Sequence, residues 1–125
     1  MSCIKRVDIS KNVFDISRDL LVTDRENQAG PPVRIDGMTL GIVTMDHDAP
    51  HGGEVHPDGD EILYIISGRA RVIGESSPEE AVELRPGDAC IVRKGEWHRV
   101  NILERTQLIY ITPGPNGDHR PLTKV

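Results

Sequence analysis

The chain has 125 residues, which is enough for one domain with a substantial core. Its formal net charge of −5 argues against nucleic acid or an anionic membrane surface as a partner. The longest apolar run, Ile62–Ile66, is far too short to cross a bilayer, and Met1–Ser10 has no apolar core of a signal peptide. With only Cys3 and Cys90 a disulfide framework is not expected, so we expect a cytoplasmic protein.

Short strands are expected along most of the chain, because turn residues recur about every ten positions. Strands are expected in the N-terminal part (1–37) and in a core of about 38–112, and an extended or loose tail in 113–125. Helix has little place, with at most a turn or two in Ser17–Asn27. Such a pattern predicts an all-β sandwich or barrel in a single domain. The core strands are expected at 38–43, 62–66, 69–73, 81–84, 89–92, 99–103 and 107–112.

Ionisable residues gather just before two of these strands. Glu54 and His56 are two residues apart, so on a strand they share a face. Glu61 opens the next strand after a turn, and a tight hairpin brings it beside that pair. His98 arrives from a distant strand. Each residue taken singly is more often an ordinary surface or turn residue, but two imidazoles and carboxylates converging among apolar strands predict a divalent metal site.

The first cluster follows a known motif: His-x-His, three or four residues, Glu, six residues, Gly. Here Glu54-x-His56, four residues, Glu61, six residues and Gly68 match at every place but the first His. The motif usually opens with a Gly six residues before its first His, where this chain has Asp48.

The second cluster follows the companion motif: Gly, five residues, Pro-x-Gly, two residues, His, three residues, Asn. Here Gly87, five residues, Arg93-x-Gly95, two residues and His98 match, with Arg93 in the place of Pro. Asn101 comes one residue early. With both motifs in order, the chain resembles the cupin superfamily in a small, single-domain form.

This resemblance implies an antiparallel jelly-roll β-barrel that carries one divalent metal ion (Fe, Mn, Ni or Zn) on three His and one Glu. His56, Glu61 and His98 fall on ligand positions, and Glu54 stands where the first His is usual. Glu54 is either a ligand, or a catalytic acid or base beside a two-His, one-carboxylate site, or the metal has been lost. His51, on the preceding loop, is a further candidate ligand.

Two classes of function are compatible with such a site. One is a metal-dependent enzyme of dioxygenase, isomerase, cyclase or lyase type, acting on a small molecule in the barrel. The other is a non-catalytic module that binds or senses a small molecule. Arg69 and Arg71 alternate with Ala70 and Val72, and we expect the arginines on a solvated face. The opposite orientation would line the cavity with cations and imply an anionic substrate.

A homodimer is expected from the strand after Glu61. If Glu61 points inward, so do Leu63 and Ile65, and the residues between them, Ile62, Tyr64 and Ile66, face out. A strand that is apolar on both faces needs cover on both. Either the N-terminal stretch around residues 13–16 folds over this face, or a second subunit packs against it. The cupin resemblance favours the second subunit.

Overall fold

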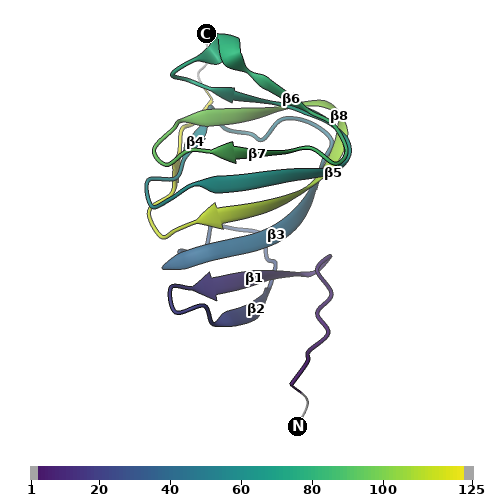
Figure 1. The fold of residues 1–125 in the computed structure, drawn as a ribbon, viewed down its shortest axis with the longest axis vertical. Coiled ribbons are helices and arrows are strands. Elements are labelled where there is room, and N and C mark those ends of the chain that lie inside the picture. Colours follow the sequence, from purple (N-terminus) through teal and green to yellow (C-terminus); the bar gives the residue numbers. More distant parts are fainter. Residues whose placement is uncertain (1–2, 123–125) are drawn as a thin grey trace.

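Strands make up almost all of the regular structure in the computed structural model, which describes residues 3–122 (Figure 1). Those residues contain no α-helix, and therefore none that is long and apolar enough to cross a membrane. The all-β class is confirmed. The elements are β1 (Asn12–Ser17), β2 (Val22–Glu26), β3 (Gly37–Met45), β4 (Glu54–Val55), β5 (Glu61–Gly74), the 3-10 turn η1 (Pro78–Glu80), β6 (Val82–Leu84), β7 (Ala89–Val92), β8 (His98–Pro113) and β9 (Asp118–His119).

The long strands β5 and β8 pair antiparallel over most of their length and form the spine of the fold. Each contains two of the short strands that the sequence predicts. The turn expected at Ser67–Gly68 is instead a bulged stretch inside β5, where the register with β8 shifts repeatedly between Ile65 and Ala70. Gly68 has a φ of 86°, a conformation that favours glycine. The chain therefore bends here without reversing.

All strand pairs are antiparallel, and the sheet runs in the order β2-β1-β3-β8-β4-β9, with β5 also paired to β8. β6 pairs with residues 70–72 of β5, and β7 pairs with residues 61–64. Among the described residues β6 and β7 pair only with β5, so backbone hydrogen bonds do not close the sheet into a complete barrel.

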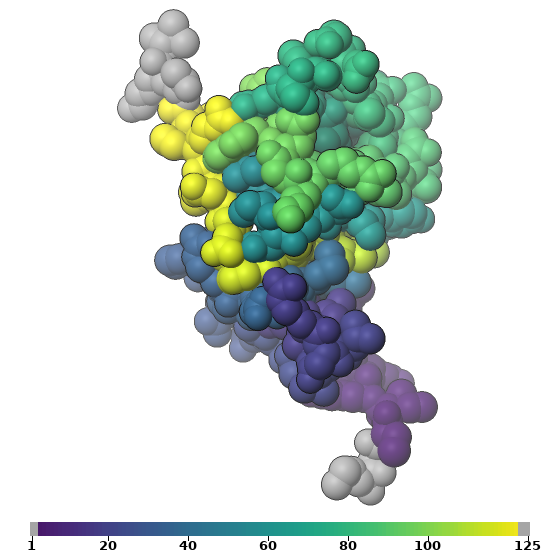
Figure 2. Space-filling view, turned by 60° about the vertical axis from the view of Figure 1, so that its left-hand side comes forward, coloured from purple at the N-terminus to yellow at the C-terminus, as the bar shows by residue number. Residues whose placement is uncertain are grey.

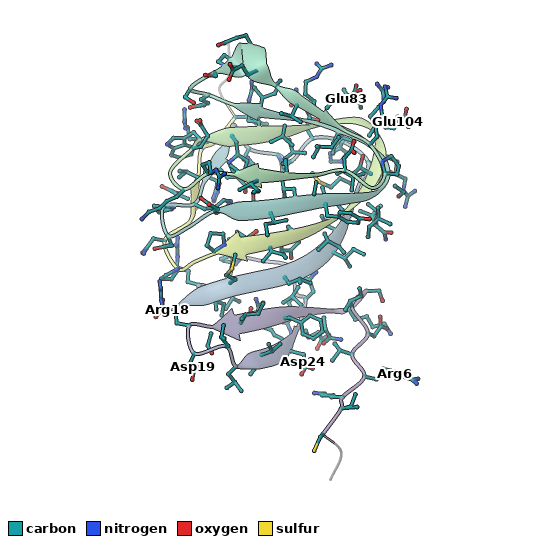
Figure 3. The ribbon with its side chains drawn as sticks, viewed as in Figure 1. Arg6, Arg18, Asp19, Asp24, Glu83 and Glu104 are labelled. Atoms are coloured by element: carbon teal, nitrogen blue, oxygen red, sulfur yellow. The ribbon has the colours of Figure 1, made fainter. Side chains whose placement is uncertain are left out.

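The inner face of the bent sheet holds the core, and the two-residue alternation predicted for β5 is present. Ala70 and Val72 are buried, so Arg69 and Arg71 lie on the outer surface, as expected. Arg69 there bridges two carboxylates that project outward (Figure 3), at 2.9 Å from Glu83 and 3.2 Å from Glu104. The buried core residues are Leu63, Ile65, Ala70, Val72, Leu84, Val92 and Leu108.

The N-terminal region consists of strands. Ser17–Asn27 forms no helical turn; it contains β2, which makes a hairpin with β1. β1 pairs with the edge of β3, and so extends the sheet instead of covering its outer face. Along β1, Val13 and Asp15 are buried and Phe14, between them, lies on the other face. This alternation matches a strand that continues the sheet. Arg25 and Thr39 hydrogen-bond the Asp15 carboxylate.

The described part of the tail is paired with the sheet and is not loose. Its strand β9 pairs with β4, and Figure 2 shows the segment (yellow) along the flank of the molecule. The Arg120 guanidinium lies 3.9 Å from the ring centre of Trp97 and also binds Glu75. Trp97 thus packs against the tail. The rest of the predicted tail, residues 123–125, lies outside the described residues.

Candidate metal centre

The structure brings together all four residues that the motifs single out. Glu54, His56, Glu61 and His98 each offer a ligand atom, and these atoms all lie within 4.8 Å of one another. Glu54 opens β4, Glu61 opens β5 and His98 opens β8, while His56 directly follows β4. Glu54 is the register partner of His98, so two residues distant in sequence are juxtaposed by one strand pair.

Both imidazoles face both carboxylates through Nε2. His98 Nε2 lies 3.0 Å from Glu61 Oε1 and 3.4 Å from Glu54 Oε1. His56 Nε2 lies 3.2 Å from Glu61 Oε2 and 3.7 Å from Glu54 Oε1. His56, Glu61 and His98 are buried, whereas the Glu54 side chain is 33% exposed. Glu54 therefore forms the open side of the cluster.

Neighbouring groups orient two of these side chains. The carbonyl oxygen of Glu96 accepts a hydrogen bond from His98 Nδ1 at 3.1 Å, which keeps a proton there, so that in the neutral ring the lone pair of Nε2 faces the cluster. The Thr112 hydroxyl donates to Glu61 Oε2 at 2.6 Å. Outer partners of this kind fix the ligands of metal sites.

His56 supplies the test of whether a metal fits. Both of its ring nitrogens are buried and neither makes a well-formed hydrogen bond within residues 3–122, although Nε2 lies 3.2 Å from Glu61 Oε2. A buried polar atom without a well-formed hydrogen bond is costly. A cation among the four side chains would satisfy Nε2, and two imidazole nitrogens with two carboxylate oxygens suit Fe, Mn, Ni or Zn. The residues present fit a divalent ion.

The electrostatics of the cluster point the same way. Burial opposes ionisation of Glu54 and Glu61, but the facing histidines outweigh it and hold both pKa values below normal. Burial likewise opposes the charge on the imidazoles, but the two carboxylates raise the pKa of His56 to about 9 and that of His98 to about 10. In the metal-free cluster each imidazole thus carries one extra proton. The two positive charges equal the charge that one divalent ion would supply.

His51 stands outside this group. Its Nε2 is 3.8 Å from Glu54 Oε2, and its Nδ1 accepts a hydrogen bond from the backbone N–H of Gly53. Neutral His51 therefore carries its proton on Nε2, facing Glu54, and presents no lone pair to a metal there. His47 and His119 are exposed, and His119 lies beside the ring of His51.

Thr112 and Cys90 are site neighbours that the motifs do not include. Thr112 shares the inner face of β8 with Leu108 and Tyr110, but its contact with Glu61 depends on the β5–β8 register. Cys90 lies opposite Leu63 on β7, and burial followed by the charge of Glu61 raises its thiol pKa to about 11. A thiol kept neutral in this way behaves as a small apolar residue.

Residues 41–112, more than half of the chain, match the model of the cupin domain family. The chain belongs to the cupin family. Solved structures agree on the fold of this cupin. Protein NMB1881 from Neisseria meningitidis is 20% identical over 72% of this chain and 88% of its own, with a TM-score of 0.54. A cupin-2 domain protein from Shewanella frigidimarina is 19% identical over 70% and 83%, with a TM-score of 0.52.

Oxalate decarboxylase from Bacillus subtilis, whose Mn(II) centres have been studied, is 25% identical over 68% of this cupin, with a TM-score of 0.53. The cupin spans only 24% of that enzyme's length. No curated protein matches the chain.

Proposed function

We propose that this cupin is a metal-dependent enzyme that acts on a small molecule, and that Glu54, His56, Glu61 and His98 bind one divalent ion of Fe, Mn, Ni or Zn. The observation that carries the proposal is the four-residue cluster whose ligand atoms converge and in which neither buried ring nitrogen of His56 makes a well-formed hydrogen bond. The cupin oxalate decarboxylase with its Mn(II) centres lends support by analogy.

A bound metal in such a site supplies a Lewis acid that polarises an oxygen atom of the substrate. The chain's own residues orient the ligands and exchange a proton with the substrate. The Glu96 carbonyl and Thr112 hold His98 and Glu61 in place. Glu54, on the open side, is the residue that we propose exchanges a proton with the substrate. Its lowered pKa keeps it ionised at neutral pH, so it has no proton to donate and could act only as a proton acceptor, and the same lowering makes it a weak one while the imidazoles are protonated.

Metal analysis of the purified protein tests the site. We expect about one divalent ion per chain, and its loss in the His56→Ala and His98→Ala variants. The exposed His47 provides the control, because His47→Ala leaves the cluster intact. Recovery of folded, metal-free protein from metal-replete medium would contradict the proposal. Oxygen uptake and product analysis with small carbonyl and phenolic compounds would then separate an enzyme from a non-catalytic binding module, in which metal binds without turnover.

We further propose that the protein is a cytoplasmic homodimer. Cys3 and Cys90 are both free thiols, which suits a reducing compartment. The dimer is supported by the outer face of β5, where Ile62, Tyr64 and Ile66 are all partly exposed. Register places more apolar residues on this face, from β1, β3, β7 and β8, namely Phe14, Ile16, Leu40, Ile42, Ile91, Ile109 and Ile111. Exposed apolar patches of this kind mark interaction sites.

A further inference from the structure

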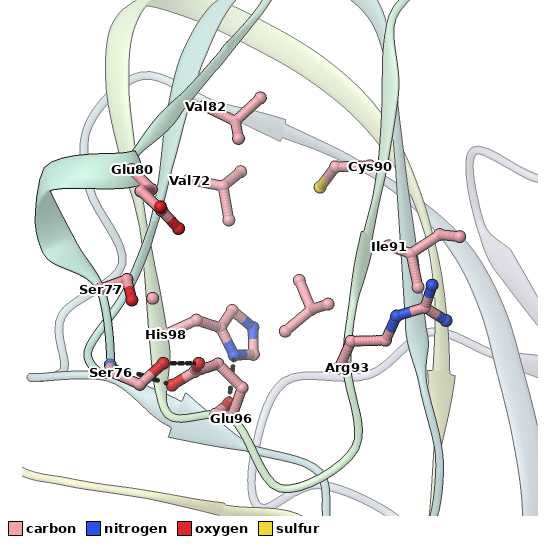
Figure 4. Close-up of a pocket in the computed structure, with 12 residues that line it drawn as sticks. Val72, Ser76, Ser77, Glu80, Val82, Cys90, Ile91, Arg93, Glu96 and His98 are labelled. Carbon is pink, nitrogen blue, oxygen red and sulfur yellow. Dashed lines mark hydrogen bonds between the residues drawn. The ribbon is translucent and has the colours of Figure 1, made fainter.

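A cavity of about 240 Å³ opens between β6 and β7 and reaches His98 of the metal centre (Figure 4). We call it the β6–β7 cavity. It lies where these two strands pair with different halves of the bent strand β5 and not with each other. The break in the sheet is therefore an opening toward the inside of the fold, beside one of the four proposed ligands.

The walls of this cavity are apolar. Val72, Val82, Cys90 and Val92 line it, and Val72 and Val92 are buried. The volume has room for about eight water-sized groups, which fits a single six-membered ring with one substituent. Binding sites of this type take their affinity from apolar contact and their orientation from a few polar groups.

The charged residues at the rim are predominantly acidic. The Glu80 side chain points toward the middle of the cavity (Figure 4), and Glu96 also lines it, accepting hydrogen bonds from Ser76. Arg93 is the one arginine or lysine of the lining, but its side chain points away from the cavity and binds Asp60 at 3.1 Å. His98, which is protonated in the metal-free protein, also lines the cavity, but its Nε2 faces Glu61 and Glu54 at 3.0 and 3.4 Å. No unpaired cation is therefore directed at a bound molecule by the lining residues.

The metal centre adds no attraction for anions either. A divalent ion bound by Glu54 and Glu61 would have its charge balanced by the two carboxylates. A site with three neutral histidines and one carboxylate would instead keep one positive charge. Arg69 and Arg71, which would favour an anionic substrate if they faced inward, lie on the outer surface.

We propose that the β6–β7 cavity binds a molecule with a compact apolar body and no negative charge, and that it discriminates against carboxylates. If the bound molecule is the substrate, the proposal rests on the proposed metal-dependent function. The apolar walls provide the affinity, and the acidic rim beside a charge-balanced centre disfavours an anion.

Three probes of the same ring size and different charge test this: benzyl alcohol, benzoate and benzylamine. Binding is measured by ligand-observed NMR and calorimetry on the full chain, metal-free and zinc-loaded. We expect benzyl alcohol and benzylamine each to bind at least about tenfold more tightly than benzoate. Benzoate binding as tightly as the alcohol or the amine would overturn the proposal, as would the absence of binding by all three at millimolar concentration.

Two variants with matched controls locate the effect. Val82→Phe fills the cavity from an exposed strand and should abolish binding of benzyl alcohol, whereas Val22→Phe on the exposed strand β2 should leave it unchanged. Glu80→Lys should strengthen benzoate binding severalfold, whereas Glu79→Lys, next to it but outside the lining, should not. Equal effects in variant and control would overturn the assignment of the site.

The outcome is separable from that of the proposed function. A protein that binds no metal but still prefers benzyl alcohol would refute the metal-dependent function and keep the cavity's selectivity. A protein that binds metal at Glu54, His56, Glu61 and His98 but prefers benzoate would keep the metal centre and refute the selectivity.

Discussion

At the scale of single residues, the distinctive feature of this cupin is Glu54. The family motif has a histidine in its place, and the structure puts the carboxylate 3.4 Å from His98 Nε2 and 3.7 Å from His56 Nε2. One charge distinguishes this cluster from a three-His, one-Glu site. The change should lower the Lewis acidity of a bound ion and favour harder metals.

Replacing Glu54 by Gln keeps the shape of the side chain and removes its charge. If Glu54 is a ligand, metal affinity should fall by more than the roughly 10- to 100-fold loss typical of an outer partner. Competition with a chromophoric chelator measures this, and Glu83→Gln on the outer surface is the control. Unchanged affinity with lower turnover would assign Glu54 as a base alone, and unchanged affinity with unchanged turnover would remove it from both roles.

At the scale of elements, the bulged stretch of β5 decides the shape of the fold. It lets one strand pair with β7 before the bend and with β6 after it. Gly68 is required there because a Cβ atom would lie 2.0 Å from the carbonyl oxygen of Arg105. Gly87 also has a positive φ, of 92°, but a Cβ there would meet nothing within 4 Å.

This pair of glycines gives a matched test of the bulge. Gly87→Ala should cost about 1 kcal/mol of unfolding free energy, the penalty of the left-handed backbone conformation alone. Gly68→Ala adds an overlap with backbone and should cost about 3 kcal/mol or more. Urea unfolding of the two variants measures the difference. Equal losses would show that the strand relaxes around the new methyl group.

At the scale of the whole molecule, two properties depend on many residues together: assembly and the response to pH. The apolar outer face spans several strands, and β1 extends the sheet without covering that face. The response to pH comes from the four-residue cluster, whose charges are buried together.

The dimer is tested by mass and by one substitution. Light scattering at micromolar concentration should give the mass of two 13.8 kDa chains. Ile62→Lys places a charge between Ile91 and Ile111 on the outer face and should give the monomer, because a lysine is costly to bury in an interface. Val33→Lys, exposed and outside the strands, should stay dimeric. A monomeric wild-type protein would refute the dimer, and a dimeric Ile62→Lys variant would refute the choice of face.

The pH dependence of stability should differ between metal-free and metal-loaded protein. The raised pKa values of His56 and His98 stabilise the metal-free fold fully below 6.5, and this contribution is lost as pH rises through about 9 and 10. The lowered pKa values of Glu54 and Glu61 contribute above 4.5, and their contribution is lost as pH falls below that value. The metal-free protein should therefore have its highest stability from these groups between 4.5 and 6.5.

Thermal unfolding with a chelator and with excess metal measures this. Metal binding requires neutral imidazoles, so the melting temperature gained from metal should grow as pH rises toward 9. A double variant, His56→Asn with His98→Asn, should lose the dependence above pH 6.5. Metal-free melting temperatures that rise between pH 6.5 and 9 would contradict the protonation of the cluster.

The sequence by itself determined the strand-rich class, the four clustered residues and the inward or outward direction of side chains along β5. These depend on local information: motif spacing, turn residues and the two-residue period of a strand. The prediction that Glu54, His56, Glu61 and His98 converge is confirmed by their geometry, whereas their roles as ligands stay a prediction.

Only the tertiary structure decided how the strands continue and which distant residues meet. From the sequence alone, Gly68 could either end a strand at a turn or bend a strand that continues. Its close approach to the backbone of Arg105, which only the structure shows, identifies it as the residue of a bend. The contact of Thr112 with Glu61, the pairing of the tail with β4 and the opening between β6 and β7 likewise depend on long-range register. The hydrophobic pattern of a strand specifies which face it buries, but which distant segment it pairs with depends on packing and hydrogen bonding across the whole sheet.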